Sequence, residues 1–133
     1  MNYQASGTFE VKLTPQPPTD DTESPVPGRM LIAKQFHGPL NATSKGQMLA
    51  AGTEVKGSAG YVAMEQVTGS LQGRKGSFVL QHSGTMDRGA ASLSVCVVPD
   101  SGTGELAGLT GAMTINIENG KHFYDFTYVM PSP

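Results

Sequence analysis

The stretch "AMTINIENGKHFYDFTYVM", residues 112–130, decides the fold of this chain. Apolar and polar residues alternate on both sides of Asn119 and Gly120, which is typical of two half-buried strands. An Asn-Gly pair between such runs predicts a two-residue type I′ hairpin, because both central residues of that turn need positive φ. Strands at 112–118 and 121–130 are therefore expected to pair antiparallel.

The same period-two alternation recurs along the rest of the chain. No segment keeps apolar residues at helical spacing for three turns without a glycine, so helices are expected to be short or absent. With 133 residues, the chain predicts a single all-β domain over residues 1–133. The six further strands expected are 8–13, 29–36, 47–51, 60–68, 77–83 and 92–98.

Composition narrows the classes of partner. Nine Lys and Arg stand against eleven Asp and Glu, and the longest basic run is "GRKG" at 73–76, so nucleic acid is not an expected partner. The single cysteine, Cys96, excludes an internal disulfide framework. No run of about 18 apolar residues and no apolar leader occur, which indicates a cytoplasmic protein that does not bind a membrane.

Three corners share the pattern G-x-L-x-[GA], beginning at Gly38, Gly69 and Gly104. Each corner joins an even-numbered strand to the next odd one, so all three are expected at the same end of an up-and-down meander. The central leucines are expected to close that end. The glycines assigned to these corners are Gly69, Gly73, Gly102, Gly104, Gly108 and Gly111.

The corner "SGTGELAG" at 101–108 also contains the spacing G-x-G-x-x-A, which is typical of dinucleotide sites. Such a site needs a helix directly after the glycines, and Gly108 and Gly111 would interrupt it. We therefore interpret the stretch as a strand-to-strand corner and expect no cofactor. The Pro-rich segment at 14–28 lies at the opposite end, and its composition favours an acidic surface loop over a functional lid.

Three stretches carry a resemblance to known proteins: "GSFVLQHSGTM" at 76–86, "VVPDSGTGELAGLTG" at 97–111 and "GKHFYDFTYVMP" at 120–131. Over residues 9–131 the chain resembles an uncharacterised bacterial family, domain of unknown function thirty-two twenty-four. The resemblance implies an eight-stranded antiparallel up-and-down barrel like that of allene oxide cyclase, within the broader lipocalin-like set. The glycines at 102–111 are also similar to a corner in allene oxide cyclases and dirigent proteins. No catalytic residue set of either class occurs, so the resemblance implies a fold and no reaction.

Candidate chemistry rests on polar residues within apolar alternation. Glu65 shares a strand face with Tyr61, and His82 shares one with Phe78. If both faces point inward, Glu65 and His82 come together inside the barrel, either as a structural hydrogen-bonded pair or as an acid-base pair. The last strand places His122, Tyr124 and Tyr128 on one face.

Two hypotheses follow for function, and a third is kept open. The first is a barrel that binds a small apolar ligand at the end opposite the glycine corners. The second is an isomerase or cyclase that uses Glu65 and His82 as candidate catalytic residues. The third is a structural or assembly protein, and we expect a small homo-oligomer because Met30, Leu31 and Ile32 place apolar groups on both faces. The three histidines lie far apart, so no metal site is expected. The candidate ligand-binding residues are Tyr61, Glu65, Phe78, His82, His122, Tyr124 and Tyr128.

Overall fold

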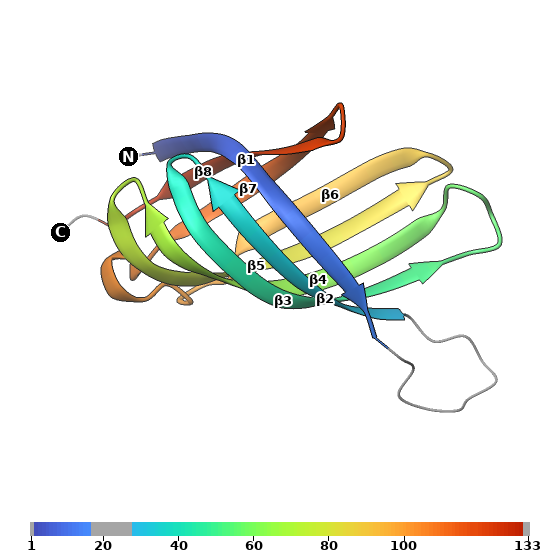
Figure 1. The fold of residues 1–133 in the computed structure, drawn as a ribbon, viewed down its shortest axis with the longest axis horizontal. Helices are drawn as coiled ribbons and strands as arrows, with labels where there is room; N and C mark the ends of the chain where they lie inside the picture. Colours follow the sequence, from blue (N-terminus) through green and yellow to red (C-terminus); the bar gives the residue numbers. More distant parts are fainter. Residues whose placement is uncertain (1, 17–27, 132–133) are drawn as a thin grey trace.

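The computed structural model describes residues 2–16 and 28–131. Over these residues eight strands form a closed barrel in which neighbours in the chain pair antiparallel and β8 closes onto β1 (Figure 1). The all-β, eight-stranded up-and-down barrel is therefore confirmed. The strands are β1 Asn2–Pro15, β2 Gly28–His37, β3 Leu40–Gly52, β4 Ala59–Leu71, β5 Arg74–Asp87, β6 Ala90–Val97, β7 Thr110–Glu118 and β8 Lys121–Val129.

Helix is nearly absent, as glycine spacing predicted. Within the described ranges the one helical element is a single 3-10 turn, η1 Gly104–Leu106. In the same part of the chain, no helix is long and apolar enough to cross a membrane. The Pro-rich segment predicted as a loop or lid falls largely outside the described residues, since only its ends belong to β1 and β2.

The β7–β8 hairpin forms at the predicted Asn-Gly pair. Asn119 has a φ of 52° and Gly120 a φ of 77°, which are the positive values that a type I′ turn requires. Glu118 and Lys121 face each other as the last paired residues on either side.

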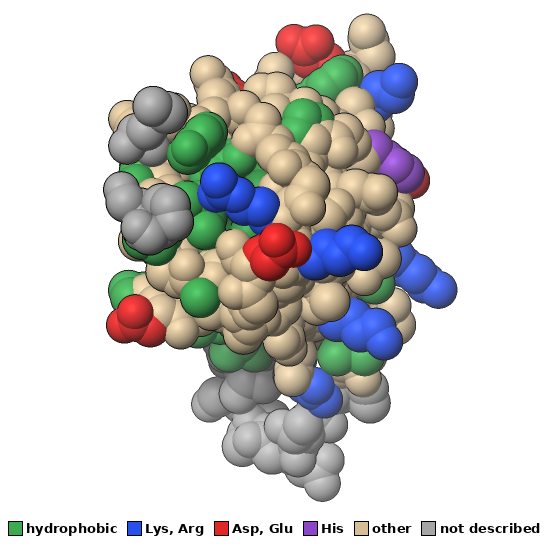
Figure 2. Space-filling view, turned by 90° about the vertical axis from the view of Figure 1, so that its left-hand side faces the viewer, with side chains coloured by type: hydrophobic (Ala, Val, Ile, Leu, Met, Phe, Trp, Pro, Cys, Tyr) green, Lys and Arg blue, Asp and Glu red, His purple; other side chains and the backbone are tan. Residues whose placement is uncertain are grey.

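The three glycine corners lie at one end of the barrel, and their leucines close it. Leu40, Leu71 and Leu106 are all buried. Phe36, Phe78 and Phe126 pack beneath them without exposure to solvent above 1%. Figure 2 faces this end and shows no opening between the atoms of the described residues. We call it the closed end.

The stretch with dinucleotide-like spacing is a strand-to-strand corner between β6 and β7. Five of its backbone amides already donate to protein carbonyls: those of Ser101, Thr103, Leu106, Ala107 and Leu109. Because these donors are occupied and no helix follows, the corner does not offer the row of free amides that a phosphate cradle needs.

The opposite end of the barrel, which we call the open end, is not filled by the inward-facing side chains of the described strands. Alternation along the strands directs Leu13, Met86, Leu93 and Ile117 inward, yet each is between 42% and 60% exposed. Large apolar side chains that point into a barrel and still meet solvent indicate an unfilled interior at that end.

The barrel has one weak seam. β6 pairs with β7 through two residue pairs, Val95 with Met113 and Cys96 with Ala112, while β5 pairs with β6 through eight. In Figure 1 the tip of the β5–β6 hairpin lies at the right, whereas the tip of the β7–β8 hairpin lies at the top. The barrel is thus closed around its waist and splayed between β6 and β7 at the open end.

Candidate ligand site

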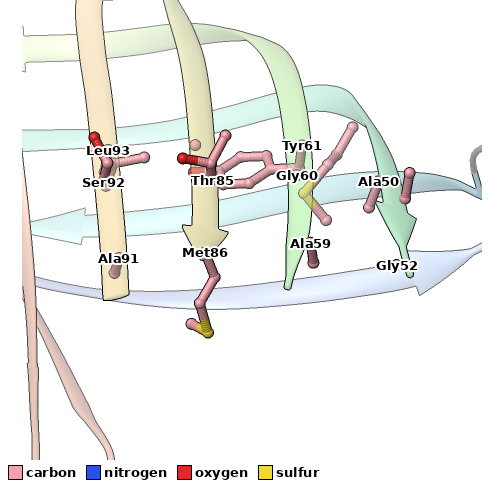
Figure 3. A pocket seen from close by; sticks show the side chains of 13 residues that line it. Ala50, Gly52, Ala59, Gly60, Tyr61, Thr85, Met86, Ala91, Ser92 and Leu93 are labelled. Carbon is pink, nitrogen blue, oxygen red and sulfur yellow. The ribbon is translucent and has the colours of Figure 1, made fainter. Parts of the chain in front are cut away.

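A pocket of about 440 Å³ occupies the open end between β3, β4, β5 and β6 (Figure 3). Among the described residues, its wall is apolar apart from Tyr61, Thr85 and Ser92, and it includes no charged side chain. Thr85 and Ser92 are the outward-facing members of their strands. Tyr61 therefore supplies the one polar side chain of the wall that belongs to the barrel interior.

Small residues create this space. Ala50, Tyr61, Gly84 and Leu93 stand side by side on the four strands. A Cβ atom at Gly84 would lie 2.5 Å from Cε1 of Tyr61, so the glycine lets the tyrosine ring lie across β5 (Figure 3). The ring of Tyr61 consequently forms the floor of the pocket.

Four polar side chains meet in the interior beyond this floor, one from each of β2 to β5. Lys34 Nζ donates to Glu65 Oε1 at 2.9 Å, and His82 Nε2 contacts the same oxygen at 2.7 Å. The Ser44 hydroxyl donates to Glu65 Oε2 at 2.6 Å. We call these four residues the buried polar cluster.

The cluster forms because the strand register aligns inward-facing positions. Lys34 pairs directly with Ser44. Glu65 lies one inward position closer to the open end than the β4 residue that pairs with Ser44. His82 lies one inward position closer to that end than the β5 residue that pairs with Glu65. The Lys34 ammonium also lies 4.9 Å from the ring centre of Phe9 and 5.7 Å from that of Phe36. These aromatic faces favour a cation in an otherwise apolar interior.

Glu65 is ionised at neutral pH. Burial raises the pKa of this carboxyl, but the hydrogen bond from His82, the charge of Lys34 and the hydrogen bonds from Ser44 and Lys34 together outweigh burial. The net effect lowers the pKa of Glu65 from 4.5 to about 2. Both carboxylate oxygens are engaged by side chains of the cluster, so Glu65 acts as an acceptor for the cluster itself.

His82 is oriented by this carboxylate. An ionised carboxylate only accepts hydrogen bonds, so a neutral imidazole must carry its hydrogen on Nε2 and present a lone pair at Nδ1. Among the described residues, no hydrogen bond to His82 Nδ1 is found. In a neutral His82, Nδ1 is therefore an acceptor that the cluster itself does not use.

Tyr61 separates the pocket from His82. The two ring centres are 6.3 Å apart. Burial raises the pKa of the Tyr61 phenol, and the nearby charge of Glu65 adds to this effect. Tyr61 is therefore a neutral phenol at physiological pH, placed between the apolar wall and the buried polar cluster.

The structure divides the residues that the sequence singled out. It brings Glu65 and His82 together in the barrel interior, with Tyr61 above them as the one member of the candidate set that lines the pocket. Tyr124 and Tyr128 lie in the packed core instead, where the Tyr124 hydroxyl donates to the His37 carbonyl at 2.8 Å and the Tyr128 hydroxyl donates to Gln72.

Phe78 and His122 also lie away from the pocket. Phe78 stacks on Phe126 within the core, and His122 packs against Phe9, with ring centres 5.1 Å apart. None of these four aromatic residues of the candidate set lines the pocket.

Two members of the cluster, Lys34 and Ser44, were missed by sequence reasoning. Lys34 interrupts an apolar face in the alternation Ile32, Lys34, Phe36, which is the signal that had pointed to Glu65. Within residues 2–16 and 28–131, no three His, Cys, Asp or Glu side chains gather as a metal site would require.

Comparison with known proteins gives a family and no activity. A family model described as "Protein of unknown function (DUF3224)" matches residues 5–128, which include all or part of every strand. The chain belongs to the DUF3224 family. No curated protein matches it.

A DUF3224 protein of known structure supports the fold. The crystal structure of a protein with unknown function from Shewanella oneidensis MR-1 is 52% identical in sequence to this chain. The match covers 99% of this chain and 100% of that one, with a TM-score of 0.92. The barrel is thus shared by both DUF3224 proteins, whereas the likeness to allene oxide cyclase stays a prediction.

Proposed function

We propose that this DUF3224 protein binds a small, uncharged, mainly apolar molecule in the open end of its barrel. The observation that carries the proposal is the pocket of about 440 Å³, to whose wall residues 2–16 and 28–131 contribute no charged side chain. Its volume lies in the range of sites for small ligands, which are concave and mostly apolar. A ligand would cover inward-facing side chains such as Leu93, which are otherwise left in contact with water.

The absence of charge in the wall argues for an uncharged ligand. Transfer of an ionised group out of water is costly unless an opposite charge or several hydrogen bonds replace its hydration. In the described part of the chain, the nearest interior charges are those of Lys34 and Glu65, and these are paired with each other. Neither is available to neutralise a charged ligand.

A fluorescence titration with N-phenyl-1-naphthylamine, a neutral apolar probe, tests the proposal. Wild-type protein is expected to give a saturable increase in probe fluorescence. Ala50→Phe fills the pocket opposite Tyr61 and is expected to weaken probe binding at least tenfold. Leu49→Phe is the matched control, because Leu49 neighbours Ala50 but is an exposed residue outside the pocket.

The control also separates the pocket from the outer surface. Probe binding that is weakened equally by both substitutions, or that never saturates, would contradict a site inside the barrel. Circular dichroism of each variant checks that the barrel is folded. Native mass spectrometry of freshly purified protein then identifies any molecule retained from the cell.

The contact between Glu65 and His82 favours a second candidate function, proton transfer of the isomerase or cyclase type. A histidine whose Nε2 is held by a carboxylate presents Nδ1 as a general base, and the carboxylate stabilises the imidazolium that forms. The test is a screen of epoxide and unsaturated-acid substrates with wild type, His82→Ala and Glu65→Gln. Wild-type turnover that is lost in His82→Ala is expected, and turnover that survives both substitutions contradicts this function.

The proposal includes two further expectations, which concern the oligomeric state of the protein and its location in the cell. A small homo-oligomer is expected from apolar residues on the barrel exterior, among them the exposed Leu31. Sedimentation velocity measures it directly, and a monomer over the whole concentration range contradicts it. The cytoplasmic location is checked by cell fractionation.

A further inference from the structure

Among the described residues of the pocket wall, Tyr61 is the one whose side chain is both polar and inward-facing. No hydrogen bond to its hydroxyl is found within residues 2–16 and 28–131. The side chain is half-buried, and its ring extends from β4 toward β5 (Figure 3). A ligand that displaces water from the pocket would therefore lie against a phenol whose hydroxyl needs a new partner.

The hydroxyl-bearing half of the ring lies against residues that line the pocket. Gly84 pairs with Tyr61 on one side and with Leu93 on the other. A Cβ atom at Gly84 would lie 2.5 Å from Cε1 of Tyr61 and 3.3 Å from Cδ1 of Leu93. Cε1 neighbours the ring carbon that carries the hydroxyl, and both Gly84 and Leu93 belong to the pocket wall. The hydroxyl is thus held beside the apolar part of the pocket.

The Tyr61 hydroxyl keeps its hydrogen at physiological pH. Burial raises the pKa of this phenol, and the nearby charge of Glu65 raises it further. A neutral phenol donates one hydrogen bond and can also accept one. The floor of the pocket therefore offers a ligand one hydrogen-bond donor in apolar surroundings.

We infer that the ligand of this pocket is an uncharged apolar molecule with a carbonyl group, as in a ketone or an ester, and that the carbonyl oxygen accepts a hydrogen bond from the Tyr61 hydroxyl. The inference rests on the proposed binding function and narrows its ligand class. The hydrocarbon part of the ligand contacts apolar wall residues such as Met48, Ala50 and Leu93.

Other ligand classes match the floor less well. A hydrocarbon would cover the phenol and replace none of the hydrogen bonds that water makes to it. An alcohol can accept from Tyr61 but brings a hydrogen of its own, and the other polar side chains of the described wall, Thr85 and Ser92, face outward. A carboxylate would add a negative charge near Glu65, whose cation Lys34 is already paired with it. A carbonyl supplies an acceptor without a donor or a charge.

The test compares two ligands of the same shape in two proteins. 2-Octanone and 2-methyl-1-octene differ only in that a methylene group replaces the carbonyl oxygen. Both displace N-phenyl-1-naphthylamine, and the probe affinity of each protein converts displacement into a dissociation constant. Tyr61→Phe is expected to weaken binding of 2-octanone about tenfold and to leave binding of 2-methyl-1-octene unchanged. Comparing wild type with the variant cancels the difference in hydrophobicity between the ligands.

A matched control and a spectroscopic measurement locate the hydrogen bond. Ser92→Ala removes an outward-facing hydroxyl of the same wall and is expected to leave the affinity for both ligands unchanged. In infrared spectra, the carbonyl stretching band of bound 2-octanone is expected at lower frequency in wild type than in Tyr61→Phe. Tyr61→Phe removes a hydroxyl without a partner among the described residues, so the barrel should stay folded, which circular dichroism checks. In wild type, 2-octanol is expected to bind more weakly than 2-octanone.

The outcomes separate this inference from the proposed function. Equal weakening of both ligands by Tyr61→Phe, or no weakening of 2-octanone, overturns the hydrogen bond from Tyr61 while leaving apolar binding in place. A carbonyl band at the same frequency in both proteins overturns it as well. Tighter binding of 2-octanol than of 2-octanone overturns the carbonyl class. If the probe does not bind wild type at all, the proposed function itself fails.

Discussion

At the scale of single residues, the stability of the barrel interior depends on the ion pair between Lys34 and Glu65. Their side chains are 7% and 0% exposed and 2.9 Å apart. A buried ion pair contributes little to the free energy of unfolding compared with apolar packing. Removal of one partner, however, leaves the other charge buried and unpaired, which is strongly destabilising. Glu65→Gln is expected to lower the free energy of unfolding by about 3–5 kcal/mol in urea denaturation.

A double variant provides the comparison for this prediction. Lys34→Met with Glu65→Gln removes both charges, so it should be more stable than Glu65→Gln alone. A double variant that loses the sum of the two single effects would show that the charges do not interact.

The low pKa of Glu65 predicts a loss of stability in acid. The pKa falls from 4.5 to about 2 on folding, so the ionised carboxyl stabilises the folded state above pH 4.5, and this stabilisation is lost as pH falls toward 2. Linkage gives a loss of about 2 kcal/mol between pH 6 and pH 3. Urea denaturation at both pH values measures it. The double variant lacks the carboxyl, and an equally steep loss in that protein would assign the effect to other groups.

At the scale of elements, the β6–β7 corner depends on glycine. Gly104 has a φ of 60°, and a Cβ atom there would lie 2.9 Å from the Lys75 carbonyl oxygen. Gly104→Val is expected to lower the free energy of unfolding by about 1–3 kcal/mol and to reduce the melting temperature. Gly52→Ala is the control, because a Cβ atom at Gly52 meets nothing within 4 Å.

The same corner gives a prediction for nucleotides. Because five of its backbone amides already donate to protein carbonyls and no helix follows the glycines, NAD or ATP is expected to leave the melting temperature unchanged. Saturable stabilisation by either nucleotide, lost in Gly104→Val, would restore the dinucleotide interpretation of residues 101–108.

The seam between β6 and β7 predicts uneven protection of backbone amides. β6 has only two residue pairs with β7, whereas β4 has thirteen with each of its neighbours. In hydrogen exchange, amides of residues 90–94 that point toward β7 are expected to exchange faster than amides in the middle of β4. Equal protection of the two strands would mean that the seam is closed in solution.

At the scale of the whole molecule, the two ends of the barrel differ in how completely side chains fill them. Phe126 is fully buried at the closed end, and Phe126→Ala is expected to lower the free energy of unfolding by about 3–5 kcal/mol. Leu93 points inward at the open end but is 42% exposed, so Leu93→Ala should lower it by less than about 1 kcal/mol while weakening probe binding. Urea denaturation compares the two. A larger loss for Leu93→Ala would contradict an unfilled open end.

Local sequence patterns determined most of the fold. Alternation around Asn119 and Gly120 specified the last hairpin, because side-chain period and turn geometry are properties of neighbouring residues. The repeated leucines at 40, 71 and 106 indicated one closed end. Strand lengths were underestimated: β3 runs from Leu40 to Gly52, although alternation had predicted only residues 47–51. Its first half combines polar residues with Gly46, and pairing on both sides holds it in the barrel.

The sequence by itself determined that the chain forms antiparallel strands, where they turn, and that Glu65 and His82 sit on apolar faces. Only the tertiary structure decided that Lys34 and Ser44 complete their cluster, that Tyr124 and Tyr128 belong to the packed core, and that space remains beside Tyr61. The physical reason is that alternation identifies a face within one strand, whereas contacts across strands depend on register and barrel closure. These are set by all eight strands together.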